Sequence, residues 1–407
     1  MTAPAATLAR PTRVVTLLGP AVVAGVAYLD PGNVASNMTA GALFGYLLVW
    51  VVVAGNATAW LIQYLSAKLG IATGASLPEL LGTSIPRPWL RRAFWVQAEL
   101  VAMATDIAEV IGGAIALALL FHWPLLVGGL VTGLVSLVLL LLQSRGRAQV
   151  FERLVTVMVV VIGVGFCAGL VVAPPSWAGV VDGLVPGFDG SRSVLLAVSI
   201  LGATIMPHAI YAHSALARDR FGGSPVPVRQ LMKATKIDVT VALAVAGTVN
   251  VAILLVAAGT LRGVAGTDSL EGAYTALLVH LGPVIATLFA IGLLASGLAS
   301  TSVGAYAGSE IMHGLLRRRV PLLYRRIVTI VPALVLLGFG VDPTQALVLS
   351  QVALSFGIPF ALVPLVVYTA RRSTMGDLRN RWWTTALAAT AASALIALNV
   401  VLLVLTF

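Results

Sequence analysis

The chain has 407 residues, of which 59% are hydrophobic and 10% are charged, and its mean hydropathy is +1.00. Soluble globular chains carry about 25% charged residues, so this composition excludes a cytosolic enzyme, a disordered chain and a disulfide scaffold, and the single cysteine, Cys167, excludes an internal disulfide. The net charge of +10 would indicate nucleic acid in a soluble protein, but the basic residues lie between apolar blocks, so we expect no nucleic-acid partner and interpret the charge as a topology signal.

The N-terminal segment, residues 1–13, is short and basic and leads directly into apolar sequence. It resembles the start of a signal peptide, but the apolar run continues past the length of an h-region and has no small-residue cleavage site. We therefore expect a cytoplasmic tail.

Eleven apolar runs follow, each bounded by charged residues or by proline and glycine. A helix crosses the core of a bilayer with about 20 residues, so each run is predicted to be one membrane-spanning helix. No connection is long enough for a soluble domain, so residues 1–407 are expected to form a single transmembrane domain. The predicted spans are 15–42, 45–68, 93–121, 124–143, 152–173, 193–217, 238–260, 281–314, 325–341, 344–369 and 383–406.

The basic residues test this count and give the orientation. With the N-terminus inside, 23 of the 25 Lys and Arg residues fall in inside segments, and only Arg192 and Arg262 fall outside. Losing or adding an interior span would destroy this asymmetry, so the count supports a cytoplasmic N-terminus and a C-terminus outside. The excess of Arg over Lys, 22 to 3, favours a bacterial source and hence the bacterial plasma membrane.

The first and sixth spans are each interrupted by a proline beside an ionisable residue. One proline kink in a membrane helix is usually structural, but these two prolines are 176 residues apart and each begins a block of five spans. An odd number of spans inverts the second block, so the breaks are expected to meet near the bilayer midplane, as at a transporter binding site. The repeats are predicted at about 14–173 and 193–369, with an extra helix at about 383–406. The two motifs are Asp30-Pro31-Gly32-Asn33 and Met206-Pro207-His208.

The side chains at the breaks are suited to a divalent cation. Asp30 supplies one negative charge, and unwound backbone facing a cavity frees carbonyl oxygens near Ala27 and Ala203. A thioether is soft and selects against magnesium and calcium, so Met206 favours manganese, ferrous iron, cobalt or cadmium. A methionine alone is more often a core filler, but its place beside the second break, opposite Asp30, favours a ligand.

The third span carries Glu99, Asp106 and Glu109, whose spacings of seven and three put them near one helix face. Arg325 and Arg326 open the ninth span and are expected to stabilise these acids. The chain has no nucleotide-binding loop, so an ion gradient is the expected energy source, and titratable groups in the membrane mark a proton route. The alternative is that these acids pair with arginines only to hold helices together.

Together these motifs resemble the NRAMP family of proton-coupled divalent metal transporters. The resemblance covers almost the whole chain and implies an all-α, LeuT-like fold of two inverted five-helix repeats plus one extra helix, eleven in all. Many relatives have a glutamine where Leu298 stands, a difference that leaves the metal motifs intact. Besides the two proline motifs, the resemblance is carried by Thr105-Asp106-Ile107-Ala108-Glu109, Leu294-Ala295-Ser296-Gly297 and Ala307-Gly308.

The resemblance also implies roles for individual residues. Magnesium- and aluminium-transporting relatives depart at the methionine position, so Met206 favours the transition-metal branch. Gln351 becomes an occasional metal contact and Asn250 a gate or network member, although buried amides are most often helix-to-helix hydrogen bonds. The implied metal set is Asp30, Asn33 and Met206, with the carbonyls of Ala27 and Ala203 in different states.

The implied proton route is the network between the third and ninth spans. We assign Asp30 as the coupling residue and Asp106 and Glu109 as relays. His208 is a candidate proton relay, because histidine titrates near neutral pH. For His213, five residues later on another face, a functional and a structural role are equally supported.

The expected function is import of Mn²⁺ or Fe²⁺, and also of Co²⁺ and Cd²⁺, with H⁺ as the coupling ion. No permanently bound cofactor and no obligate protein partner are expected. A sodium-coupled carrier of an organic substrate on the same fold is the first alternative, but Asp30 would repel an anion and hydroxyls are scarce at the breaks. An intramembrane enzyme is the second, and the chain lacks the protease and hydrolase motifs that it would need.

Overall fold

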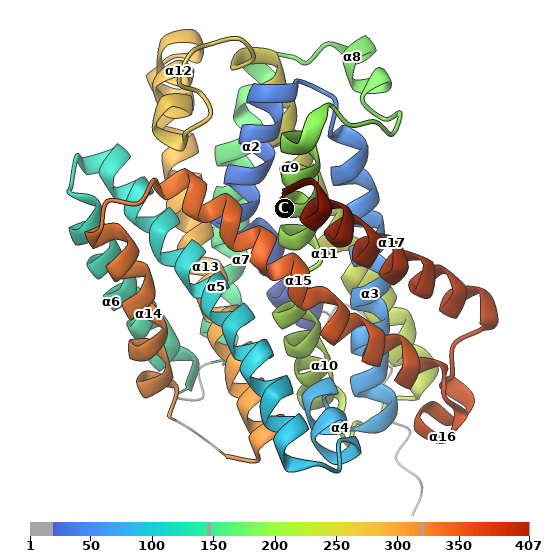
Figure 1. Ribbon diagram of the computed structural model, residues 1–407. Helices are drawn as coiled ribbons and strands as arrows, with labels where there is room; N and C mark the ends of the chain where they lie inside the picture. The colour runs from blue at the N-terminus through green and yellow to red at the C-terminus, as the bar shows by residue number, and fades with distance from the viewer. Residues whose placement is uncertain (1–18, 145–147, 319–320, 407) are drawn as a thin grey trace, which may run out of the picture.

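The computed structural model describes residues 19–144, 148–318 and 321–406, and within these ranges the chain forms helices and no strand. The predicted tail at residues 1–13 lies outside the described residues. Long helices run between the two ends of the bundle, with α8 and α12 at one end and α4 at the other (Figure 1). This arrangement confirms the all-α prediction.

The first half of the chain contains the first five predicted spans. The first span is divided into three segments, and the short helices α4 and α8 lie in connections. The elements are α1 (Pro20–Gly25), η2 (Val26–Leu29), α2 (Pro31–Phe44), α3 (Val49–Thr73), α4 (Leu77–Ser84), α5 (Pro88–Phe121), α6 (Leu125–Ser144), α7 (Ala148–Val172) and α8 (Trp177–Asp182).

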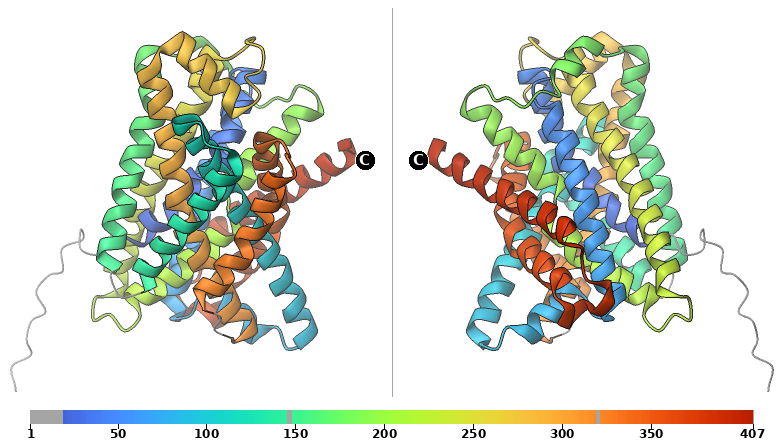
Figure 2. Two further views of the ribbon diagram at one scale, coloured as in Figure 1. Left: turned by 90° about the vertical axis from the view of Figure 1, so that its left-hand side faces the viewer. Right: turned by 90° about the vertical axis from the view of Figure 1, so that its right-hand side faces the viewer.

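The second half contains the other six predicted spans, of which the sixth is divided into α9 and α10. The elements are α9 (Gly190–Thr204), α10 (Pro207–Phe221), α11 (Val228–Thr260), α12 (Leu270–Leu281), α13 (Pro283–Leu316), α14 (Leu322–Gly338), α15 (Pro343–Ala370), α16 (Arg372–Met375), η3 (Gly376–Leu378) and α17 (Trp382–Thr406). The last helix lies obliquely along one side of the bundle (Figure 2).

Among the described residues, eight helices are long and apolar enough to cross a membrane, with the pair α9 and α10 taken as one. The first and ninth predicted spans fall on shorter helices, and of α6, the fourth, only Leu125–Leu139 enters this comparison, so the count of eleven stays a prediction. Two predicted starts were too late: α5 begins at Pro88 and not at 93, and α11 begins at Val228 and not at 238. Both helices extend toward their N-termini through basic sequence. The helix α5 begins at Pro88, since proline is tolerated in the first helical turn, and α11 begins directly after Pro227.

The first break has a local cause. Asp30 has an extended backbone (φ −70°, ψ 162°) and caps the N-terminus of α2, where its side chain accepts a hydrogen bond from the Asn33 amide N–H. Pro31 follows at the first helical position, where its missing N–H costs nothing. The preceding four residues form a single 3₁₀ turn, η2. The sequence therefore stops one helix and starts another within a single predicted span.

The second break repeats this arrangement. Met206 has an extended backbone (φ −69°, ψ 121°) and precedes Pro207, which occupies the first position of α10. Ile205 ends α9 outside the helical region. Both breaks are fully buried, and α15 packs closely against the first: a Cβ built on Gly32 would lie 1.8 Å from Nε2 of Gln351. Only glycine permits this approach.

Candidate functional site

The Asp30 carboxylate is fully buried where α2 meets α15. Its Oδ1 accepts hydrogen bonds from the Asn33 backbone N–H (2.8 Å) and from Asn33 Nδ2 (3.0 Å). Its Oδ2 accepts one from Gln351 Nε2 (3.3 Å). All of these donors are neutral, so no positive charge in direct contact compensates the carboxylate.

Asn33 joins the two breaks. Its Nδ2 also donates to the carbonyl oxygen of Ala203, at the end of α9, over 2.8 Å. The other amide oxygen atoms, Asn33 Oδ1 and Gln351 Oε1, are buried and have no hydrogen-bond partner among the described residues. A buried oxygen without a partner costs free energy, and a cation bound between these oxygens would remove that cost.

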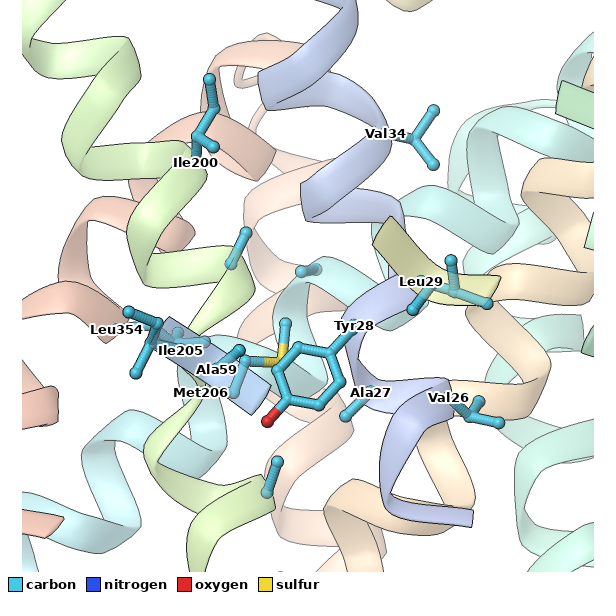
Figure 3. Close-up of a cluster of buried hydrophobic side chains, with 14 of the residues drawn as sticks. Val26, Ala27, Tyr28, Leu29, Val34, Ala59, Ile200, Ile205, Met206 and Leu354 are labelled. Atoms are coloured by element: carbon cyan, nitrogen blue, oxygen red, sulfur yellow. The ribbon is translucent and has the colours of Figure 1, made fainter. Parts of the chain in front are cut away.

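Met206 lies at the second break and belongs to the same buried cluster as Ala27 and Tyr28 of the first break. Its side chain is fully buried, and Figure 3 shows its sulfur beside the ring of Tyr28, with Ala27 close by. The structure thus brings together residues from α2, α9, the second break and α15. We call this group the break centre; it consists of Asp30, Asn33, the Ala203 carbonyl, Met206 and Gln351.

The donor set of the break centre is unusual for its lack of charge. Within the part of the chain that the structure describes, no group of three or more His, Cys, Asp and Glu side chains is placed to hold a metal. A site here must therefore use one carboxylate with amide oxygens, a backbone carbonyl and a thioether. Such mixed hard and soft donors suit a divalent transition metal better than calcium or magnesium.

A second polar region lies where α5 meets α14. The Arg326 guanidinium is 1% exposed, and its Nη1 lies 2.5 Å from Asp106 Oδ1 and 3.6 Å from Glu109 Oε2. Arg325 Nη2 lies 3.0 Å from Glu99 Oε1. The structure thus brings all five predicted residues of this region together. We call them the charge network.

The charge network holds three carboxylates against two guanidiniums. Several of the carboxylate oxygens are buried and accept no hydrogen bond among the described residues: Glu99 Oε2, Asp106 Oδ2 and both oxygens of Glu109. Besides its ion pair with Asp106, Arg326 donates to two hydroxyls, that of Ser136 at 3.0 Å from its Nε and that of Thr301 at 3.3 Å from its Nη2. The network therefore has one carboxyl group more than it has arginines to pair with it.

The two regions are adjacent. A Cβ built on Gly112, one turn after Glu109, would lie 2.1 Å from the Cβ of Pro31, so α5 packs directly on the first break. His208, the second residue of α10, is buried with its Nδ1 3.2 Å from Thr105 Oγ1 on α5. His208 lies just after the second break and thus contacts α5, the helix that carries Glu99, Asp106 and Glu109.

Polar side chains that the sequence did not single out surround the first break. Gln63 on α3 donates to the hydroxyl of Tyr28, and its Oε1 lies 2.7 Å from His213 Nδ1. Ser296 on α13 donates to the carbonyl of Leu29. A lone amide within an apolar run was the available signal for Gln63, whereas nothing in the sequence distinguished Tyr28.

Asn250 also contacts the first break. Its Nδ2 donates to the Tyr28 carbonyl over 2.9 Å, and its Oδ1 accepts from Asn37 Nδ2 at 3.4 Å. Next to this pair, the hydroxyls of Ser36 and Ser199 share a hydrogen bond of 2.6 Å that joins α2 to α9. Carbonyls released by the break are thus partly satisfied by side chains of α11 and α13, as buried backbone requires.

The two ends of the bundle differ. A hollow of about 360 Å³ opens at the end that carries α12, lined among others by Thr39, Arg192, Asp268, Asp342 and Val348. Thr39 lies nine residues after Asp30 on α2, and Val348 lies three residues before Gln351 on α15. Two of the helices that line this α12-side hollow, α2 and α15, are thus the ones that carry Asp30 and Gln351.

The opposite end is closed by ion pairs. Arg218, near the end of α10, lies 2.7 Å from Glu79 on α4, 2.7 Å from Asp219 and 3.0 Å from Glu310 on α13. Burial alone would raise the pKa of Glu79, but hydrogen bonds from Ser76 and the Arg218 guanidinium hold that pKa below its usual range. We call these four residues the Arg218 cluster; it joins three helices.

Comparison with known proteins gives consistent matches. The family model described as natural resistance-associated macrophage protein-like (Nramp) matches residues 21–405. A divalent metal cation transporter MntH from Mycobacterium tuberculosis is 56% identical over 96% of this chain and 91% of its own length. The MntH of Bacillus subtilis is 44% identical over 96% of this chain and 92% of its own length.

Solved structures agree with the sequence matches. The Eremococcus coleocola manganese transporter has a TM-score of 0.85 at 32% identity, covering 95% of this chain and 86% of that one. Mhp1, a nucleobase-cation-symport-1 family transporter, has a TM-score of 0.61 at 15% identity over 96% of this chain and 92% of its own, which shows a shared fold only. The expected LeuT-like fold is confirmed.

Proposed function

The chain belongs to the Nramp family, and from this premise we propose that it is a secondary transporter that carries divalent transition-metal ions across a membrane. The family and its relatives are transporters and not enzymes. The curated relatives are named divalent metal cation transporters, and the E. coleocola protein is named a manganese transporter. The observation that carries the proposal is the break centre, where the buried Asp30 carboxylate and Asn33 of the first break are joined by hydrogen bonds to Gln351 and to the Ala203 carbonyl beside the second break.

The metal would bind at the break centre. Asp30 supplies the charge, and the orphaned oxygens of Asn33 and Gln351 supply neutral donors without any hydrogen bond being broken. The carbonyls of Ala203 and Ala27 are available as the breaks rearrange. Met206 then sets selectivity, because its soft sulfur discriminates against calcium and magnesium in favour of Mn²⁺ or Fe²⁺.

Protons are the proposed coupling ion. A carboxylate holds a proton or a divalent cation but not both, so the arriving metal displaces a proton from Asp30. The charge network lies next to the break centre and has one carboxylate that its arginines do not balance, so it can accept this proton. His208 contacts α5 at Thr105 and therefore lies beside the proposed path of the proton from Asp30 to the charge network.

Transport would proceed by alternating access between the repeats at about 14–173 and 193–369, in the bacterial plasma membrane and with no obligate protein partner. With the N-terminus in the cytoplasm, the α12-side hollow faces outside and the Arg218 cluster faces the cytoplasm. This orientation fits import, because the hollow opens outside between helices that carry Asp30 and Gln351, while ion pairs join three helices at the cytoplasmic end.

Uptake into proteoliposomes with a metal panel and an internal pH dye tests the proposal. Mn²⁺ should enter together with protons when the outside is acidic, and an inward proton gradient should accelerate uptake. Uptake that depends on sodium and ignores the proton gradient would favour a sodium-coupled carrier instead. Failure to move any divalent metal would overturn the proposal.

A further inference from the structure

A third feature of the bundle belongs neither to the break centre nor to the α12-side hollow. It is an apolar groove of about 440 Å³ on the side of the bundle between α1, α7 and α11, two of which, α7 and α11, run side by side (Figure 2). Its floor is made of small residues, Gly25, Gly163 and Ala242. A Cβ built on Gly163 would meet nothing within 4 Å, so the groove is open at that point.

The walls of this groove face lipid. Val160 on α7 and Val241 on α11 are more than half exposed, at 61% and 51%, although both belong to helices that are apolar enough to cross a membrane. Water is not available at this depth to fill an apolar slot. Acyl chains are therefore the material that the surroundings supply.

Two cations mark one end of the groove. Arg153 lies on α7 one turn before Thr156 and two turns before Val160, and these three positions share a helix face. Lys233 starts the i, i+4 row of α11 that leads to Val241. Both cations are exposed, and in the described ranges neither forms an ion pair with a carboxylate. Their charge is thus available to an anion at the bilayer surface.

We propose that the groove binds one anionic phospholipid, with an acyl chain along α1, α7 and α11 and the phosphate between Arg153 and Lys233. In the orientation proposed above, these cations lie at the cytoplasmic leaflet, where anionic lipids attract basic residues. Since α1 forms one wall, the bound acyl chain packs against the helical segment that precedes the first break. The lipid is therefore placed to resist movement of α1 away from α7.

Native mass spectrometry of the full chain with equal amounts of phosphatidylglycerol and phosphatidylcholine tests this site without any metal. The wild type should retain one phosphatidylglycerol in preference to phosphatidylcholine. Gly163→Leu fills the groove and should remove that bound lipid. A cation at an anionic surface strengthens binding about fivefold, so Arg153→Gln with Lys233→Gln should reduce the preference roughly 30-fold.

Matched controls separate this site from general lipid adhesion. Ala353→Leu fills a different membrane-facing groove, between α5 and α15, and should leave the bound lipid in place. Lys236→Gln removes a cation three residues from Lys233 whose Nζ lies 6.0 Å from the centroid of the Trp60 ring, and it should leave the preference unchanged. The proposal fails if Gly163→Leu retains the same lipid, if the preference survives loss of both cations, or if the wild type retains neither lipid. None of these results bears on metal transport.

Discussion

The break centre and the charge network are both buried in the same bundle, but their carboxylates have different partners. Asp30 is held by neutral amides of Asn33 and Gln351. Asp106 is held by a guanidinium at 2.5 Å. An amide donor gives way to a cation without leaving a charge unpaired, whereas breaking a buried ion pair strands one. This difference is the physical reason for our proposal that the metal binds at the break centre and that the charge network holds a proton.

Replacing Asp30 with Asn should have the largest effect, because it removes the only charge of the break centre. Loss of a residue that only hydrogen-bonds to a metal ligand already costs about 10–100-fold in metal affinity, so we expect Mn²⁺ binding and uptake to fall by more than about 100-fold. Calorimetric titration and radioactive uptake measure the two quantities. Asp342→Asn, at the α12-side hollow, is the control and should keep Mn²⁺ uptake within a few-fold of wild type. Equal losses in both variants would contradict a specific role for Asp30.

Arg326→Gln should change proton flux through the charge network much more than Mn²⁺ affinity at the break centre. It leaves Asp106 and Glu109 buried without their cation, a change that costs about 3–5 kcal/mol of stability. Proton flux should fall at least tenfold, while Mn²⁺ affinity at the break centre should change little. Arg325→Gln is the matched variant and should have a smaller effect, because its partner Glu99 is less buried. A parallel loss of metal affinity and proton flux would show that the regions act as one.

Met206→Ala should change selectivity more than rate. The oxygens of the break centre remain, so Mn²⁺ uptake should persist in part. Without the soft donor, the ability of Ca²⁺ or Mg²⁺ to compete should rise by about tenfold. Competition assays with a fixed Mn²⁺ concentration measure this shift. An unchanged ion preference would remove the thioether from the selectivity argument.

Glu79→Gln should have the smallest effect, because its ion pair with Arg218 is partly exposed, in contrast to the buried pairs of the charge network. The lowered pKa of Glu79 means that its pairing with Arg218 stabilises the fold above the usual glutamate pKa and is lost as pH falls below it. Partly exposed pairs contribute less than about 1 kcal/mol. Thermal unfolding of wild type should thus lose a small increment of stability on acidification below about pH 4.5, and the variant should lack that increment. An identical pH dependence in both proteins would contradict the assignment.

The sequence predicted the features that depend on local chemistry. Each proline placed a break to within a residue, since proline cannot continue the preceding helix. The spacing of Glu99, Asp106 and Glu109 predicted a shared helix face, and the structure places these residues opposite Arg325 and Arg326.

What the sequence did not predict depends on how helices pack. The contacts of Gln63 with Tyr28 and His213 join residues from three separate elements, and only the packing of α3 against the broken helices brings them together. Asp238 on α11 likewise accepts hydrogen bonds from the backbone N–H groups of Gly19 and Ala21 at the start of α1. No pattern within one segment encodes such an arrangement.

Anomalous diffraction at the manganese absorption edge, from crystals of the protein grown with Mn²⁺, tests the central claim most directly. We expect one strong peak at the break centre, within bonding distance of both an Asp30 oxygen and the Met206 sulfur, and no peak at the charge network. A peak among Glu99, Asp106 and Glu109, or one bound by Asp30 with Met206 out of reach, would contradict the account.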